Sequence, residues 1–192
     1  MSDERPPLVF IDVDGVINAV GDKHGRLSPN RARHFLSVEV PAGDGETVTV
    51  LYRPDVVARL RDLSESGRAE FVWLTTWRHI AREHVAPLIG LPDWEAIPHP
   101  IDVGEDTDGV AAHQWDRARP WWKTQGVLDR TADGRQFAWL DDDLAPATKR
   151  RVRELRPQPS LLVTPPSGIG LTSRLVAQLE LFCGVERDGD DA

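Results

Sequence analysis

Residues 8–16 of the chain read LVFIDVDGV, and this stretch decides which fold the sequence encodes. An apolar run with strand character ends in two carboxylates, Asp12 and Asp14, and Gly15 follows them. Because side chains alternate along an extended segment, a strand over 8–14 would place Asp12 and Asp14 on one side. Open α/β sheets place their ligand sites at such strand ends. Two carboxylates there can bind Mg²⁺, or one can attack phosphorus while the other moves a proton.

The rest of the chain alternates apolar runs with amphipathic segments. Short apolar runs predict further strands at 71–74, 137–140 and 160–164. Helical spacing predicts helices that open at Arg53-Pro54-Asp55 and end at Gly67, and over 78–90, 115–128, 146–156 and 172–182, with Thr172 as the N-cap of the last. Strands that alternate with helices indicate a parallel sheet covered on both faces, which is the α/β class.

Composition limits the functional classes. The chain has 192 residues, enough for one domain with a sizeable core, and its net charge of −8 disfavours nonspecific binding to nucleic acid, although a local basic site remains compatible with it. Cys183 is the single cysteine, so no internal disulfide forms and nothing indicates an oxidising compartment. The start of the chain is not a signal peptide and no apolar run has membrane-span length. We expect a cytoplasmic protein without a membrane partner.

Three of the four apolar runs end in residues that can carry chemistry. Asp12 and Asp14 follow the first run, Thr75 and Thr76 follow the second, and the third ends in three consecutive aspartates, 141–143. The carboxyl ends of parallel strands lie at one edge of a sheet, so these groups are expected to converge. One strand that ends in aspartate is weak support for a site, whereas three chemically loaded strand ends are much stronger support.

This order of motifs resembles the haloacid dehalogenase-like (HAD) superfamily of phosphohydrolases. The resemblance covers residues 8 to about 145. The segments WLTTWR (73–78), WLDDDL (139–144) and GLT (170–172) are similar to a small-cap bacterial subgroup that includes HAD domains associated with RNA repair. The matching positions are Asp12 and Asp14 for the first motif, Thr75 for the second, Lys123 for the third, and Asp141 and Asp142 for the fourth.

The resemblance implies a Rossmann-like three-layer α/β/α sandwich and a set of catalytic roles. Asp12 would be the nucleophile and form an aspartyl-phosphate, while Asp14 would protonate the leaving oxygen and then activate water. Thr75 and Lys123 would hold the nonbridging phosphate oxygens. A solvated Lys123 and a Thr75 that only caps the next helix are the plainer interpretations, with Arg78 and Arg119 as substitutes for the lysine.

The resemblance also implies a Mg²⁺ cofactor and a set of substrate contacts. Asp12, the main-chain carbonyl of Asp14, and Asp142 would hold the ion, with Asp141 as the close alternative to Asp142. An EF-hand interpretation of the first motif fails, because Val16 and Ile17 occupy positions where that loop needs a ligand and a glycine. The expected substrate-binding residues are Gly15, which would let the loop approach the phosphate, Thr76 as the second phosphate ligand, and Trp77 and Arg78 in the pocket.

The chain has room for only a small cap over such a site. About sixty residues separate Asp14 from Thr75, and they include a predicted β-hairpin at 35–52; a loop insertion is expected at 91–114. We expect one HAD-like domain over 8–185, with a flexible start at 1–7, a β-hairpin flap, no large cap domain and an acidic disordered tail at 186–192. Such a site would be open and admit a bulky substrate.

The function predicted from the sequence is Mg²⁺-dependent hydrolysis of a phosphomonoester, with a nucleotide or a polynucleotide end as the preferred phosphorylated substrate. A phosphatase of small metabolites, and a weakly catalytic or non-catalytic HAD module that binds a phosphorylated partner, are the alternatives. A basic run at 149–153 resembles a nucleic-acid patch, but it is expected to be a solvated helix face that points away from the site. Trp121 and Trp122, next to Lys123, either line the pocket or pack in the core.

Overall fold

Five parallel strands form the central sheet of the molecule, which we describe from a computed structural model over residues 5–21, 27, 32–43, 45–100 and 121–186. The strand order, β5-β4-β1-β6-β7, places β1 at the centre. The strands are β1 (Leu8–Ile11), β4 (Glu70–Trp73), β5 (Glu95–Ala96), β6 (Phe137–Leu140) and β7 (Ser160–Val163). The first motif therefore lies at the middle of one sheet edge.

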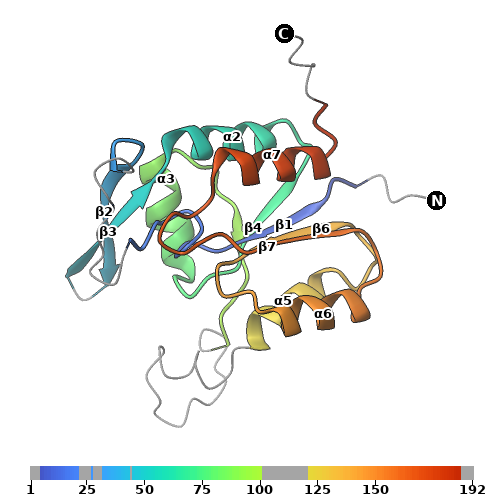
Figure 1. Cartoon of the computed structure of the whole chain (residues 1–192). Coiled ribbons are helices and arrows are strands. Elements are labelled where there is room, and N and C mark those ends of the chain that lie inside the picture. The colour runs from blue at the N-terminus through green and yellow to red at the C-terminus, as the bar shows by residue number, and fades with distance from the viewer. Residues whose placement is uncertain (1–4, 22–26, 28–31, 44, 101–120, 187–192) are drawn as a thin grey trace.

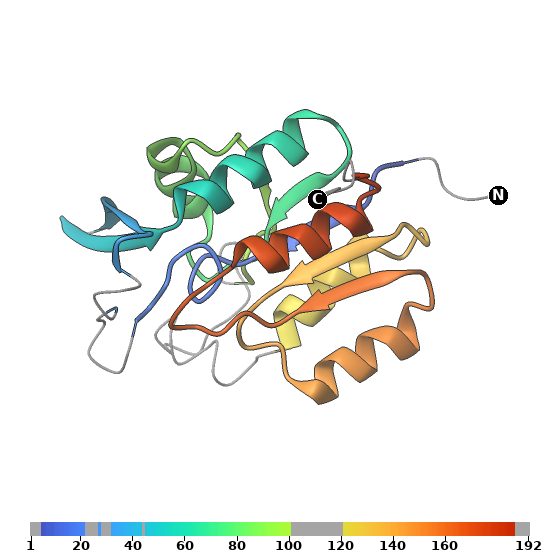
Figure 2. The same cartoon turned by 45° about the horizontal axis from the view of Figure 1, so that its top comes forward.

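Helices cover both faces of the sheet and make three layers (Figures 1 and 2). Alternation along β1 builds both cores, because Val9 and Ile11 face one side while Leu8 and Phe10 face the other. The first layer contains α2 (Pro54–Glu65), the π-helical turn η1 (Ala81–Val85), α3 (Ala86–Ile89) and α7 (Ser173–Phe182). The second contains α5 (Trp121–Arg130) and α6 (Pro146–Leu155). This is the expected Rossmann-like α/β/α sandwich.

Three helices begin at residues that favour a helix start. Pro54 and Pro146 stand at the start of α2 and α6, where a missing N–H is harmless. Thr172 caps α7 as predicted, since its hydroxyl accepts a hydrogen bond from the Leu175 N–H at 3.3 Å.

The predicted hairpin is present as β2 (Leu36–Gly43) and β3 (Glu46–Tyr52), an antiparallel pair outside the main sheet. Val40 and Val50 are fully buried and anchor it in the first core, and β2 contacts η1 and α3. Figure 1 shows the hairpin beyond the carboxyl ends of the central strands. The hairpin therefore stands at the same end of the molecule as the first motif.

Some predicted boundaries are wrong. The sheet gains the short edge strand β5 inside the segment expected to be a loop, next to Trp94, which stacks on Phe71 with ring centroids 4.4 Å apart. The helix expected over 78–90 is present over 79–89, but its middle is the π-helical turn η1.

Some predictions fall outside the described residues. These residues include 101–120, which hold most of the expected 91–114 loop and the first part of the predicted 115–128 helix. They also include 1–4 and most of the predicted tail. Within the described ranges, no helix is long and apolar enough to cross a membrane.

Candidate active site

Three strand ends meet at the centre of the sheet edge, as the sequence predicted. Ile11 pairs with Trp73 of β4 and with Leu140 of β6, so the next residue in each strand falls at the same level. The main chain continues this pairing for one step, because the Asp12 N–H donates to the Leu140 carbonyl at 3.1 Å. Asp12 and Asp141 thus leave neighbouring strands side by side. Thr75 stands one residue farther along its strand, after Leu74, whose N–H donates to the Ile11 carbonyl at 2.9 Å.

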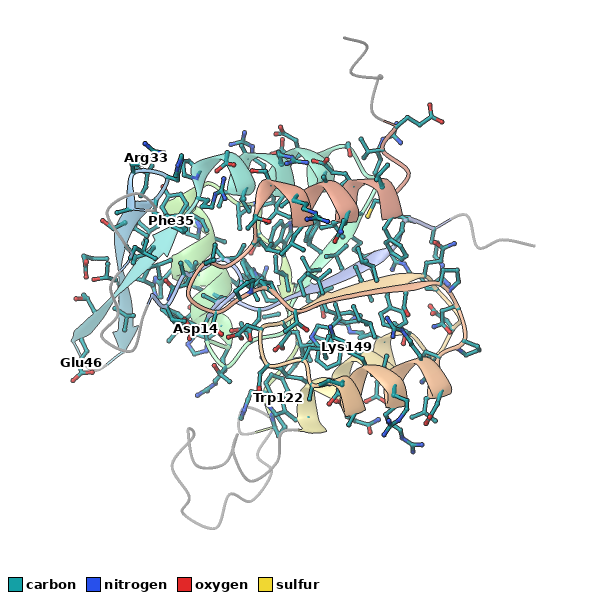
Figure 3. All side chains as sticks on the ribbon, viewed as in Figure 1. Asp14, Arg33, Phe35, Glu46, Trp122 and Lys149 are labelled. Carbon is teal, nitrogen blue, oxygen red and sulfur yellow. The ribbon has the colours of Figure 1, made fainter. Side chains whose placement is uncertain are left out.

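The first motif turns sooner than expected. β1 ends at Ile11, and the residues from Val13 to Asn18 form a tight loop in which the Gly15 N–H donates to the Asn18 carbonyl at 2.8 Å. The prediction of a strand through Asp14 is therefore wrong. Asp12 stays buried at the strand end, while Asp14 sits half-buried on the loop beyond the carboxyl ends of the strands (Figure 3).

Lys123 connects two of the strand ends. Its Nζ donates to Oδ2 of Asp12 and, at 2.8 Å, to Oδ2 of Asp141. The lysine comes from α5 and its side chain is only 15% exposed, while those of the two aspartates are 8% and 3% exposed. A buried cation that bridges two buried carboxylates is not a solvated surface lysine, so that plainer interpretation of Lys123 is wrong.

Burial dominates the electrostatics of this cluster. It raises the pKa of Asp12 to about 6; Lys123 and a hydrogen bond with Thr75 pull that pKa down, while Asp141 pushes it up. Burial also raises the pKa of Asp142. Burial alone would lower the pKa of Lys123, but the charges of Asp12 and Asp141 reverse that effect and raise it. When they are ionised, Asp12, Asp141 and Asp142 carry three negative charges, and Lys123 neutralises only one of them.

The donor set fits a hard divalent cation. Asp12, Asp141 and Asp142 each offer a carboxylate oxygen within 4.8 Å of the others. Oxygen ligands of this kind suit Mg²⁺, and a divalent charge would balance the excess of carboxylates. Both fourth-motif aspartates join this group. The Asp14 carboxylate has other partners, which is consistent with the expectation that Asp14 would offer its main-chain carbonyl.

Two hydrogen bonds fix the orientation of the Asp14 carboxylate. Asn18 Nδ2 donates to Oδ1 and Trp77 Nε1 donates to Oδ2, each at 2.8 Å. Asn18 is itself buried, and its Oδ1 accepts the Leu51 N–H of β3 at 2.9 Å. Asn18 was not among the residues predicted from the sequence. Its place four residues after Asp14 on a polar-poor loop was the available signal.

Position 15 accommodates only glycine, because the Asp142 carboxylate lies against it. Its φ of 67° lies in the left-handed region, and a Cβ there would come within 2.6 Å of the Asp142 Cβ and closer still to the carboxylate. Asp142 also forms a side-chain hydrogen bond with Ser167, from the loop between β7 and α7, a residue that was not predicted from the sequence either. Glycine therefore lets the first-motif loop approach the fourth motif.

The remaining predicted residues lie around this centre. Thr75 is buried, interacts with Asp12, and accepts the Trp77 N–H at 3.2 Å, so its hydroxyl both caps the turn and reaches the reaction centre. Thr76 is exposed and lines a hollow together with Lys123. Arg78 holds a left-handed φ of 58°, a strained conformation for arginine that is often found beside functional sites.

Comparison with protein families agrees with this geometry. A family model described as the HAD domain in Swiss Army Knife RNA repair proteins matches residues 8–176. The chain belongs to this family. The matched range contains every residue of the site described above, so the HAD domain carries a phosphohydrolase-type centre with an aspartate cluster that can bind a metal. Comparison with curated proteins and with solved structures gave no significant match.

Proposed function

We propose that this HAD domain hydrolyses phosphomonoesters at polynucleotide ends, with Mg²⁺ as cofactor and Asp12 as the nucleophile. The observation that carries the proposal is the position of Asp12: a buried carboxylate at the central strand end, held by Lys123, Thr75 and its own main-chain turn. Its ion pair with Lys123 favours the ionised form that a nucleophile needs.

In the first step, an oxygen of the Asp12 carboxylate forms a bond to phosphorus, and the bond from phosphorus to the ester oxygen breaks. A protonated Asp14 delivers its proton to that oxygen, so the leaving group departs as an alcohol. Asn18 and Trp77 fix the direction in which the Asp14 carboxyl points. The second step reverses the role of Asp14, which takes a proton from water as the water oxygen attacks phosphorus and releases Asp12.

The phosphate needs positive partners that do not move during these steps. Lys123 can offer N–H donors to the nonbridging oxygens because it already lies against Asp12, and the Thr75 hydroxyl can do the same. Held by Asp12, Asp141 and Asp142, Mg²⁺ would screen the nucleophile from the negative phosphate and stabilise charge in the transition state.

The preference for polynucleotide ends rests on two supports. The family is described as belonging to RNA repair proteins, and the described residues contain a hairpin but no separate cap domain over the site. A small-metabolite substrate is the nearest alternative, and a test must therefore rank substrates.

The test is Mg²⁺-dependent phosphate release from a panel of substrates: RNA and DNA oligonucleotides with 5′- or 3′-phosphates, nucleotides, phosphopeptides and small phosphomonoesters. We expect release that is fastest from the oligonucleotides, needs Mg²⁺ and disappears in Asp12→Asn, which keeps the shape of the side chain. Faster release from small phosphomonoesters would overturn the substrate assignment. Release that survives Asp12→Asn, or no release at all from folded protein, would overturn the reaction.

A further inference from the structure

A groove between α5 and α6 leads away from the active site. Its inner part is a hollow of about 290 Å³ whose wall includes Lys123 and Asp141. Its outer part is a second hollow of about 460 Å³ between the two helices. Thr124 and Thr148 line both, so the two hollows form one continuous depression, which we call the α5–α6 groove.

The lining of the groove changes along its length. Near the reaction centre the lining is mixed: apolar and aromatic side chains and threonine hydroxyls lie together with the charged groups Lys123, Asp141 and Asp143, and the apolar members are Trp122, Trp139, Leu144 and Ala145. Figure 3 shows Trp122 at the start of α5. Farther out, the lining residues are Thr124, Gln125, Leu128, Ala147, Thr148, Arg151 and Leu155. The inner hollow therefore suits a flat, partly apolar group that carries hydroxyls, and the outer hollow offers the guanidinium of Arg151.

Arg151 belongs to the most basic helix of the fold. α6 carries four basic residues and one acidic residue in ten, a local net charge of +3 in a chain of net charge −8. Thr148, Arg151 and Leu155 recur at helical spacing on one face, so that face borders the groove. The expectation of a solvated face holds for Arg150, whose side chain is 75% exposed, and for Arg151, which is exposed as well; Arg151 in addition lines the outer hollow.

We propose that the α5–α6 groove binds single-stranded polynucleotide next to the phosphorylated end, with the terminal nucleoside in the inner hollow and a following phosphodiester at Arg151. The inference rests on the proposed function, since it names the substrate contacts of the same site. From Thr148 to Leu155 the helix advances about 10 Å, which suits a stretch of one or two nucleotides and exceeds the reach of a small metabolite.

The chemistry selects this occupant. A nucleoside presents an apolar base with hydroxyls on its sugar, which matches the apolar and threonine side chains that line the inner hollow. Each further residue of the strand adds one phosphate charge. A backbone phosphate pairs well with a guanidinium. A phosphopeptide would fill the site of the terminal phosphate but supplies neither the sugar hydroxyls nor a regular second anion.

The test is the affinity of oligoribonucleotides that carry a 3′- or a 5′-phosphate, measured by fluorescence anisotropy in Mg²⁺ buffer with Asp12→Asn protein, which binds without turnover. Arg151→Ala in that background is expected to weaken binding about five-fold. The slope of log affinity against log salt should fall by about 0.7, the value for one lost single-strand phosphate contact. Arg174→Ala, which removes the same charge from the exposed face of α7 in the other layer, is the matched control and should change neither quantity.

Equal affinities for Arg151→Ala and Arg174→Ala would overturn the proposal. So would equal affinity for an oligonucleotide and for the nucleotide with the same terminal phosphate, or displacement of the oligonucleotide by a phosphopeptide at the same concentration as by unlabelled RNA. The assay is independent of phosphate release. Hydrolysis at RNA ends without an effect of Arg151→Ala would therefore overturn the groove alone, and groove binding without any hydrolysis would overturn only the proposed reaction.

Discussion

Replacing Lys123 by methionine should destabilise the metal-free protein strongly and in a pH-dependent way. The lysine is the cation between two buried carboxylates, and removing one member of a buried ion pair costs about 3–5 kcal/mol because the remaining charge stays buried and unpaired. Methionine fills a similar volume, so the packing loss is small. We therefore expect the free energy of unfolding to fall by about 3 kcal/mol at pH 8.

The pH dependence follows from Asp12. Its pKa in the folded protein is about 6, above the ordinary value of 3.8, so the contribution of its neutral form to stability is complete below pH 3.8 and lost as the pH rises through 6. Without Lys123 that folded pKa should rise further. At pH 5 the buried carboxyl is then neutral and the loss caused by Lys123→Met should be clearly smaller than at pH 8.

Urea denaturation with EDTA at pH 5 and pH 8 measures both losses, and repetition with Mg²⁺ asks whether another cation restores stability. Lys149→Met is the matched control: Lys149 lies partly exposed on α6, and its loss should change stability by less than about 0.5 kcal/mol. A loss that is the same at both pH values, or that Mg²⁺ does not reduce, would refute the electrostatic reasoning.

Three further predictions concern the same centre. Burial raises the pKa of Asp142, so its charged form is unfavourable in the folded protein, and Asp142→Asn should raise the melting temperature of the metal-free protein by a few degrees at pH 8. The same substitution should weaken Mg²⁺ binding. Calorimetry measures both effects, and unchanged Mg²⁺ affinity would exclude Asp142 as a ligand. Trp77→Phe removes one of two donors to Asp14 and should lower kcat about ten-fold with little change in KM, so an effect confined to KM would contradict a positioning role. Mg²⁺ affinity should rise between pH 5 and pH 7, because Asp12 must lose its proton to bind the ion; titration calorimetry that finds a flat profile would argue against Asp12 as a ligand.

Much of the site could be predicted because it depends on strand ends. Alternating strands and helices imply a parallel sheet, and a parallel sheet brings its carboxyl ends together whatever the details of packing. That rule was sufficient to place Asp12, Thr75 and Asp141 at the same edge of the sheet, and the three-layer fold bears it out.

What could not be predicted depends on contacts between distant loops. Asn18 connects Asp14 to Leu51 of the hairpin, and Ser167 reaches Asp142 from the loop after β7; neither partner is visible in a local pattern. β5 has only two residues, too few for any periodicity. The early turn at Asp12 was missed because face alternation assumes that the strand continues, whereas main-chain hydrogen bonds inside the loop end it.

The central claim is that Asp12 becomes phosphorylated. The most direct measurement is an acid-quenched single turnover with an oligoribonucleotide whose terminal phosphate is radiolabelled, followed by separation of protein from RNA. We expect transient label on wild-type protein that requires Mg²⁺, maps to the peptide containing Asp12 and is absent from Asp12→Asn. Release of labelled phosphate with no label on the protein at any quench time would contradict it.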